Sequence, residues 1–107
     1  MDGQTLELDE ETLVIADSER PIALAGVMGG KLTEVDHGTR RVLLESAFFD
    51  PARVRRAARK FKISTESSYR FERRVNPEGV VFASNRAAGL LQEWAEGRAA
   101  SGLVKKD

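Results

Sequence analysis

Glu45 is the acid in this sequence most suited to chemistry, because it lies in an otherwise non-polar stretch. Residues 42–44 precede it and residues 47–49 follow it, all of them apolar. A buried acid needs a partner, and two alternatives fit. Glu45 could form an ion pair with an arginine of the following helix, or it could accept a hydrogen bond from a ligand in a pocket.

A glycine-rich segment provides a second candidate. Gly26, Gly29 and Gly30 follow an apolar run that predicts a strand. No lysine followed by serine or threonine completes a phosphate-binding loop, and the dinucleotide-binding spacing is absent, so a nucleotide site is disfavoured. Glycines let a ligand approach the backbone, but a tight turn with positive φ is the simpler interpretation.

Hydroxyl and imidazole groups are the remaining candidates. Thr65 and Ser67 could contact a ligand, although capping of a helix by Ser64 or Thr65 explains such residues equally well. His37 lies in a polar turn beside two acids, and no second cluster completes a metal site, so we expect no metal. No serine lies in a nucleophile elbow, which disfavours nucleophilic catalysis.

The charges are distributed unevenly, although the formal net charge is zero. Residues 1–50 carry a net charge of −7 and residues 51–107 carry +7. The basic stretch from residue 53 to residue 74 suits a polyanion, whereas the alternative is a solvated helix face paired with the acidic half. Arg55, Arg56 and Arg59 lie off the apolar face of their helix and are the candidate RNA contacts, whereas we expect Arg70 and Arg73 to form structural ion pairs.

The pattern of apolar residues predicts an α+β unit with short strands first, in a mixed or antiparallel sheet, and two main helices second. Strands are expected within residues 4–8, at 12–16 and 22–25 as a hairpin, at 41–46, and in the tail at 99–104. Asp50-Pro51 predicts a helix start, with an apolar face formed by Val54, Ala57, Ala58 and Phe61. Asn76-Pro77 predicts a second start, with an apolar stripe running to about Glu96.

Length and composition limit the classes of protein to which the chain could belong. At 107 residues the chain is one domain or part of one. It contains no cysteine, so disulfides and thiolate chemistry are excluded and a cytoplasmic location is favoured. No signal peptide or membrane span is apparent, which predicts a soluble protein without a membrane partner.

Three segments together resemble the bacterial phenylalanyl-tRNA synthetase β subunit. They are residues 21–30 (PIALAGVMGG), 43–51 (LLESAFFDP) and 64–73 (STESSYRFER). The resemblance covers nearly the whole chain and lies in the C-terminal half of that subunit's tRNA-editing domain. It therefore implies that residues 1–107 are a fragment of that single domain.

The resemblance implies hydrolysis of tyrosine wrongly esterified to tRNA(Phe), in support of phenylalanine-tRNA ligation. Glu45 would read the tyrosine para-hydroxyl, Gly26, Gly29 and Gly30 would form a pocket wall, and Thr65 and Ser67 would lie near the substrate. A positioned water would attack the ester, and no residue is assigned with certainty as catalytic. The parent enzyme would use ATP and magnesium elsewhere, and this segment would need no cofactor.

The implied partners are the acceptor end of tRNA(Phe), the rest of the β subunit and the α subunit of a heterotetramer. The family usually has alanine at the position of Ser67, glycine at that of Arg74 and aspartate at that of Asn76, and its pocket histidine does not correspond to His37. The alternative is a non-catalytic RNA-binding or scaffold fragment. We expect little deacylase activity from the chain alone, and its uncovered strand edges would favour a homodimer.

Overall fold

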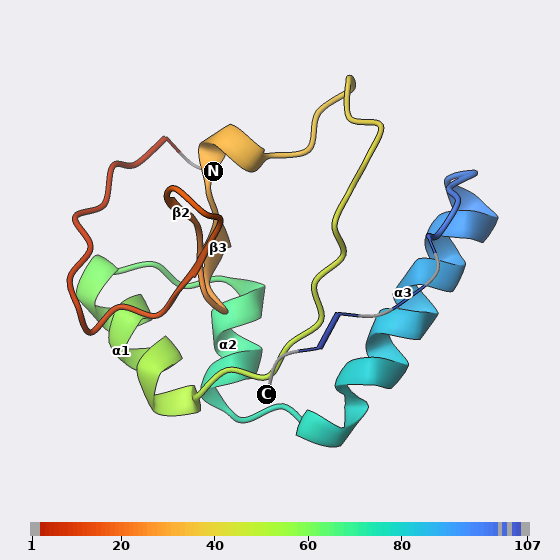
Figure 1. Ribbon diagram of the computed structural model, residues 1–107. Coiled ribbons are helices and arrows are strands. Elements are labelled where there is room, and N and C mark those ends of the chain that lie inside the picture. The colour runs from red at the N-terminus through yellow and green to blue at the C-terminus, as the bar shows by residue number, and fades with distance from the viewer. Residues whose placement is uncertain (1–2, 101, 103, 106–107) are drawn as a thin grey trace. The chain divides into compact units, whose positions relative to one another are not determined.

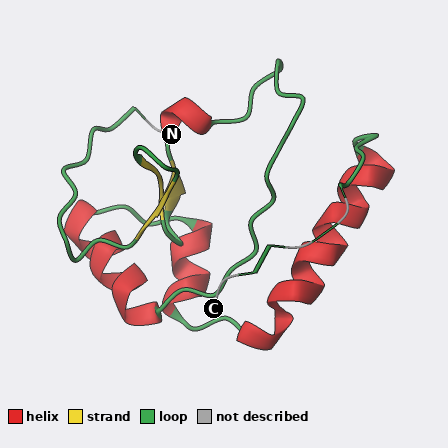
Figure 2. Ribbon diagram, viewed as in Figure 1, coloured by secondary structure: helices red, strands yellow, loops and turns green. Residues whose placement is uncertain are grey.

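The structure is a computed structural model that describes residues 3–100, 102, 104 and 105. The elements follow in the order β1 (Val14–Ala16), β2 (Pro21–Leu24), β3 (Met28–Gly29), the 3-10 turn η1 (Lys31–Thr33), α1 (Pro51–Phe61), α2 (Glu66–Glu72), the 3-10 turn η2 (Pro77–Gly79) and α3 (Val80–Trp94) (Figures 1 and 2). The predicted α+β class is confirmed, and the sheet is antiparallel in the order β1-β2-β3. The short helix α2 is additional to the two helices that the sequence predicts.

The described residues form two compact units. The first contains those up to Val42 together with Phe48–Asn76, and the second contains Leu43–Ala47 together with those from Pro77 onward. Each unit is described by itself below.

The predicted hairpin is confirmed in the first unit. Val14 pairs with Leu24 and Ile15 with Ala23, before a bulge brings Ala16 opposite Pro21. Asp17 closes the turn, because its carboxylate accepts hydrogen bonds from two backbone N–H groups, at 2.8 Å each. The strand predicted within residues 4–8 is wrong: this segment pairs with no strand of the described chain, and Leu6 packs against the core from a loop.

Helix α1 begins as the sequence predicts. The side chain of Asp50 accepts a hydrogen bond from the N–H of Ala52 at 2.9 Å, and Pro51 is the first helical residue. Val54, Ala57 and Ala58 are buried. Their side chains bring the helix against the sheet residues of the core, which comprises Leu24, Val27, Val54, Ala57 and Ile63.

Helix α2 lies within a stretch that residue patterns alone left without an assignment. Thr65 precedes it as the N-cap, and the side chain of Ser68 completes a capping box. The helix ends at Glu72, and Arg74, shortly beyond it, adopts a positive φ of 66°. Left-handed backbone favours glycine, which is the residue that the resemblance implies for this position.

The second unit departs further from the predicted elements. Residues 41–46 form no strand, and Leu43 is 98% exposed. An apolar run becomes a buried strand only when a neighbouring strand satisfies its backbone groups, and no strand of the described chain pairs with it. Helix α3 starts at Val80 after the turn η2, later than the Asn76-Pro77 signal predicts.

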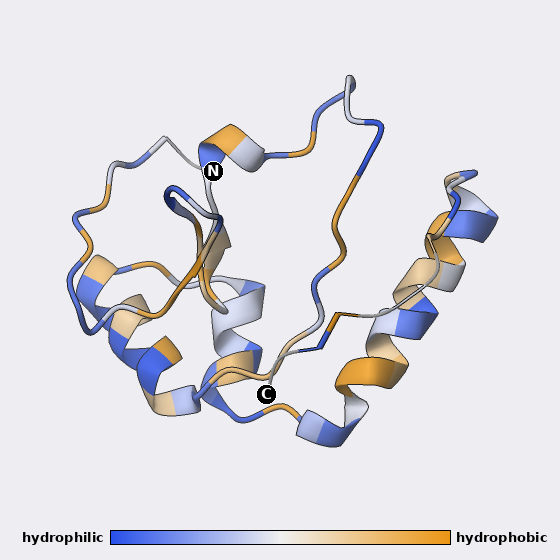
Figure 3. Ribbon diagram, in the orientation of Figure 1, coloured by the Kyte–Doolittle hydropathy of each residue, from blue (hydrophilic) through white to orange (hydrophobic). Residues whose placement is uncertain are grey.

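The apolar stripe predicted for the last helix is present, but none of the residues of α3 is buried. Phe82 and Trp94 are each 75% exposed, and Figure 3 shows hydrophobic residues recurring along this helix. The strand predicted at 99–104 is not found at Ala99, Ala100, Gly102 or Val104. Positions 101 and 103 of that prediction lie outside the described residues.

Candidate functional site

The turn between β2 and β3, residues 25–27, contains a glycine that no other residue could replace without strain. Gly26 has a φ of +73°, and a Cβ atom added there would lie 2.9 Å from Val54 Cγ2 and 3.2 Å from the ring of Phe49. The ring of Phe71 would be 3.3 Å away. Helix α1 and the two aromatic rings therefore close over the backbone of this turn, as a tight turn with positive φ requires.

Two hydroxyls at the start of α2 hold the same turn. Thr65 Oγ1 donates to the carbonyl of Val27 at 2.8 Å, and Ser67 Oγ donates to the carbonyl of Gly26, also at 2.8 Å. Thr65 Oγ1 additionally accepts the N–H of Ser68 at 2.9 Å. The structure thus brings together Gly26, Thr65 and Ser67, which the sequence assigns to one pocket.

These bonds give Thr65 and Ser67 a structural role. Each hydroxyl proton already points to a backbone carbonyl, so neither is available to donate to a ligand while the bonds persist. Ser67 Oγ retains acceptor capacity. Ser67 therefore adds one hydrogen bond between α2 and the β2–β3 turn that an alanine could not form.

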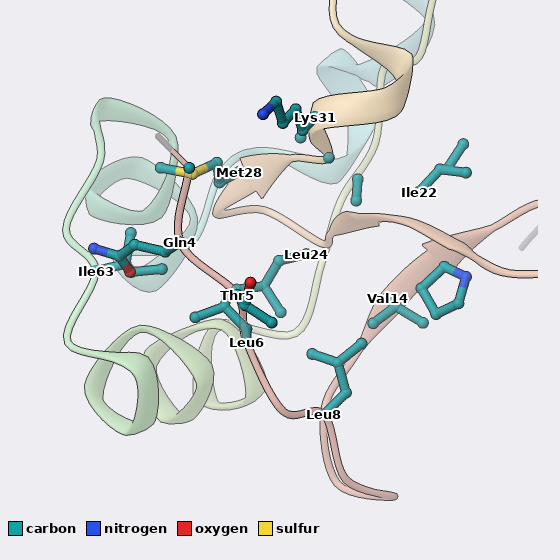
Figure 4. A pocket seen from close by; sticks show the side chains of 15 residues that line it. Gln4, Thr5, Leu6, Leu8, Val14, Ile22, Leu24, Met28, Lys31 and Ile63 are labelled. Carbon is teal, nitrogen blue, oxygen red and sulfur yellow. The ribbon is translucent and has the colours of Figure 1, made fainter. Parts of the chain in front are cut away.

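Gly29 and Gly30 lie on the other side of the sheet region, along an open hollow of about 390 Å³. The N–H of Gly30 donates to the carbonyl of Ile22 at 2.8 Å, and a Cβ at Gly30 would lie 2.6 Å from that same oxygen. Figure 4 shows Leu6, Leu24 and Met28 among the side chains around this hollow, with Lys31 beside β3. Thr65 and Ser67 do not line it, so the predicted pocket residues occupy two places in the first unit.

Glu45 belongs to the second unit and lies in an extended loop rather than at the end of a buried strand. Its neighbour Ser46 donates a hydrogen bond to the carbonyl of Val80 at 2.8 Å, which ties the segment to the start of α3. Glu45 is exposed, although nearby atoms displace part of its water and this desolvation raises the pKa of its carboxyl above the usual value. It forms no ion pair with any described residue, so the arginine pairing considered for it is not found.

The three arginines of α1 that the sequence assigns to RNA are all exposed, but they differ in their contacts. Arg55 donates to the carbonyl of Glu72 at 3.0 Å, and Arg56 forms an ion pair with Glu11 at 3.3 Å. The guanidinium of Arg59 forms no hydrogen bond or ion pair within the described part of the chain. All three lie off the buried face of α1, as the sequence predicts, and their assignment to RNA stays a prediction.

Arg70 and Arg73 form the ion pairs that the sequence predicts. Arg70 contacts Glu66 one turn earlier in α2, and Arg73 lies 3.9 Å from Glu72. The Arg73 guanidinium also stacks 3.7 Å from the centroid of the Tyr69 ring. These contacts are local to α2 and its end, and their side chains are exposed except that of Glu72, which is 24% exposed. They stabilise this short helix.

A metal site at His37 and a nucleotide site at the glycine turn would each require a particular arrangement of residues. Among the described residues, no group of three histidine, cysteine or acidic side chains is placed to hold a metal ion. Residues 26–30 form a turn and a strand that lead into no α-helix, so they do not fit ATP with magnesium. No helix in residues 3–100 is both long and apolar enough to cross a membrane.

The basic helix face is paired in part with the acidic half of the chain, as one of the two interpretations of the charge pattern expects, through contacts between the N-terminal loop and α1. Lys60 pairs with Asp9, as Arg56 does with Glu11, across about fifty positions of sequence. Asp9-x-x-Thr12 is an Asx-turn pattern that could have located the turn. The charge pattern does not specify which acids of that half contact α1.

Comparison with known proteins places this geometry in a family. The chain is 53% identical to the phenylalanine-tRNA ligase beta subunit of Moorella thermoacetica over 97% of its length, and 49% identical to that of Salinibacter ruber over the same share. The subunit of Aquifex aeolicus is 51% identical over 92% of the chain. These matches span only 12–13% of each relative's length. Residues 1–96 match the B3/4 domain family, and the chain therefore belongs to that family.

Proposed function

We propose that the chain is a segment of a phenylalanine-tRNA ligase beta subunit and contributes to hydrolysis of tyrosine wrongly esterified to tRNA(Phe). The observation that carries this proposal is the identity of about half of all residues, along nearly the whole chain, to proteins of that name. Because the match covers about an eighth of each relative, ligation with ATP and magnesium would belong to other parts of the subunit and to its α partner. The protein would work in the cytoplasm.

Glu45 would distinguish tyrosine from phenylalanine. A carboxylate that has lost part of its hydration gains a strong hydrogen bond from a phenol, whereas phenylalanine would leave it without a partner. The partial desolvation that raises the pKa of Glu45 fits this role. The ester itself would be cleaved by a positioned water, and we assign no residue of this chain to its activation.

Gly26, Gly29, Gly30, Thr65 and Ser67 would shape the pocket wall in this proposal. The bonds from Thr65 and Ser67 to the β2–β3 turn support a positioning role, because they set the backbone of Gly26 and Val27 in one conformation. Arg55, Arg56 and Arg59 would guide the acceptor end of tRNA(Phe) through contacts with phosphates, which position the RNA without reading its sequence.

The test is tyrosyl-tRNA(Phe) deacylation by the intact beta subunit carrying Glu45→Ala. We expect the preference for tyrosyl over phenylalanyl ester to fall by about 1 to 3 kcal/mol, or roughly 5- to 150-fold, which is the range for a hydrogen bond to a charged group that bound substrate would shield from water. Glu34→Ala removes the same charge from another exposed loop and should leave the preference intact. An unchanged preference in Glu45→Ala would refute the assignment.

The second candidate is a non-catalytic RNA-binding or scaffold module. It is favoured by one observation, that the hydroxyls of Thr65 and Ser67 are already bonded to backbone carbonyls. An intact subunit that binds tRNA(Phe) but leaves its tyrosyl ester uncleaved would support this candidate over the first.

A further inference from the structure

Helix α1 carries a basic face directly opposite its buried face. Arg55, Arg56, Arg59 and Lys60 follow the helical repeat, and with Ala52 they line an open hollow of about 490 Å³. We call these four cations the basic face. Figure 3 shows the hydrophilic colouring that they give to the helix. Because Val54, Ala57 and Ala58 anchor the other side in the core, the backbone beneath the basic face is held in place.

A short segment of the N-terminal loop covers part of this face. The carboxylate of Glu11 lies 3.3 Å from Arg56 Nη1, and the carboxylate of Asp9 contacts Lys60 Nζ. We call residues 9–11 the acidic turn. Arg55 is held from the other side by the carbonyl of Glu72, and Arg59 lies between them without a hydrogen-bond or ion-pair partner among the described residues.

The acidic turn has a defined conformation of its own. Asp9 Oδ1 accepts hydrogen bonds from the N–H of Glu11 at 3.0 Å and from Thr12 Oγ1 at 2.9 Å, which leaves Oδ2 for Lys60. The Lys60 hydrogen bond is also the main reason that the pKa of Asp9 is lowered to about 2. The turn therefore presents two negative charges to the basic face as a preformed unit.

These contacts are exposed, so they can be exchanged for others. The side chains of Arg56 and Glu11 are 60% and 75% exposed, and ion pairs of this kind hold their partners weakly. Phosphate oxygens can take the same donors, and a polyanion gains further from the release of counterions. A phosphodiester chain that binds the basic face would therefore compete with the acidic turn for two of the four cations, Arg56 and Lys60.

We propose that the acidic turn is an intramolecular mimic of RNA phosphates, which occupies Arg56 and Lys60 until an RNA backbone displaces it. This inference rests on the proposed contact between α1 and tRNA. It adds that Arg59 is the first cation to meet the RNA and that Asp9 and Glu11 set the affinity. The turn would favour RNA with closely spaced phosphates over a single anion.

The test compares binding of a fluorescein-labelled single-stranded RNA 12-mer to the 107-residue chain and to its Asp9→Asn/Glu11→Gln variant, across a range of salt concentrations. Asn retains the Oδ1 acceptor of the turn. We expect binding to become about three- to tenfold tighter, and the salt slope to steepen by about 1.4, at roughly 0.7 for each additional phosphate contact on a single strand.

A matched control separates local competition from net charge. Glu34→Gln/Asp36→Asn removes the same two charges, and Asp36 closes an Asx turn through the N–H of Gly38 just as Asp9 does for Glu11. We expect this control to change the affinity less than about twofold in moderate salt, because distant exposed charges are screened. Arg59→Gln should weaken binding about fivefold or more in every background.

Equal effects of the two double variants, or no effect of either, would overturn the proposal. The Glu11 side chain bonds Arg56 and no backbone group of the turn. Glu11→Gln alone therefore gives the same comparison if the double variant does not fold. Repeating the pair in the intact beta subunit covers the case in which the chain alone does not fold. These binding measurements use no aminoacyl ester. A protein that binds RNA in this way but hydrolyses no aminoacyl-tRNA would therefore contradict the proposed function, and it would leave the proposal for the acidic turn standing.

Discussion

Gly26 combines a backbone requirement with a packing requirement. Its φ of +73° disfavours any side chain, and a Cβ would meet Val54 Cγ2 at 2.9 Å in the core. We therefore expect Gly26→Ala to lower the free energy of unfolding by about 2 to 4 kcal/mol, from left-handed strain and overpacking together.

Urea denaturation followed by far-UV circular dichroism measures this change. Gly79→Ala is the matched control, because Gly79 has a φ of −82° and open space around its Cβ position. It should shift the free energy of unfolding by less than about 0.5 kcal/mol. Equal free energies of unfolding for Gly26→Ala and Gly79→Ala would show that the β2–β3 turn accommodates a Cβ atom at position 26 without a loss of stability.

The carboxyl of Asp9 reports directly on its contact with Lys60. Its pKa is lowered to about 2, chiefly by the Lys60 hydrogen bond, so Lys60→Gln should raise this pKa toward the usual 3.8. A group with a depressed pKa stabilises the fold above its unfolded value, and this contribution is lost as the pH falls from about 4 to about 2.

Carbon-13 NMR titration of the side-chain carboxyls measures the Asp9 pKa directly. Lys62→Gln removes a neighbouring exposed charge that contacts no acid, and it should leave the Asp9 pKa in place. If both variants shift the pKa equally, general charge and not the Lys60 contact controls it.

At the scale of the elements, the start of α2 joins a helix to the sheet. Thr65 caps the helix and donates to the carbonyl of Val27. Thr65→Ala loses both interactions, and we expect a loss of about 1 to 2 kcal/mol in the free energy of unfolding. Thr65→Ser keeps the hydroxyl and should stay close to the parent chain.

The same denaturation experiment tests Ser67→Ala, which introduces the residue that the resemblance implies for this position. It removes only the bond to the carbonyl of Gly26 and should cost about 0.5 to 1.5 kcal/mol. A larger loss in the free energy of unfolding from Ser67→Ala than from Thr65→Ala would contradict the conclusion that the Thr65 cap contributes more to stability than the Ser67 bond.

At the scale of the whole molecule, the second unit leaves its large apolar side chains in water. Leu43, Phe82 and Trp94 are all strongly exposed, and exposed apolar patches mark interaction surfaces. We expect the 107-residue chain to self-associate as its concentration rises, with a blue shift in the emission of Trp94, its single tryptophan.

Light scattering and fluorescence over the same concentration range test this expectation. Phe82→Ser should weaken the association, whereas Arg86→Ser, a polar change on the same helix, should not. A monomer with an unshifted emission spectrum at high concentration would contradict it.

The sequence by itself determined the elements whose signals are local. Asp50-Pro51 and the spacing of Val54, Ala57 and Ala58 specify α1, because a cap and a helical repeat need no distant partner. The hairpin of β1 and β2 and the positive φ of Gly26 follow from turn residues and β-branched runs in the same way. The pocket assignments for Glu45 and the glycines came from resemblance and stay predictions.

Only the tertiary structure decided which segments meet. The segment 41–46 contains the apolar stretch 42–44, which is typical of a strand, yet it remains a loop because no strand of the described chain satisfies its backbone groups. The capping box of α2 is local, but its hydroxyls reach the β2–β3 turn only through folding. Asp9 and Lys60 lie far apart in sequence and contact in space, because packing of α1 on the core brings the basic face beside the acidic turn.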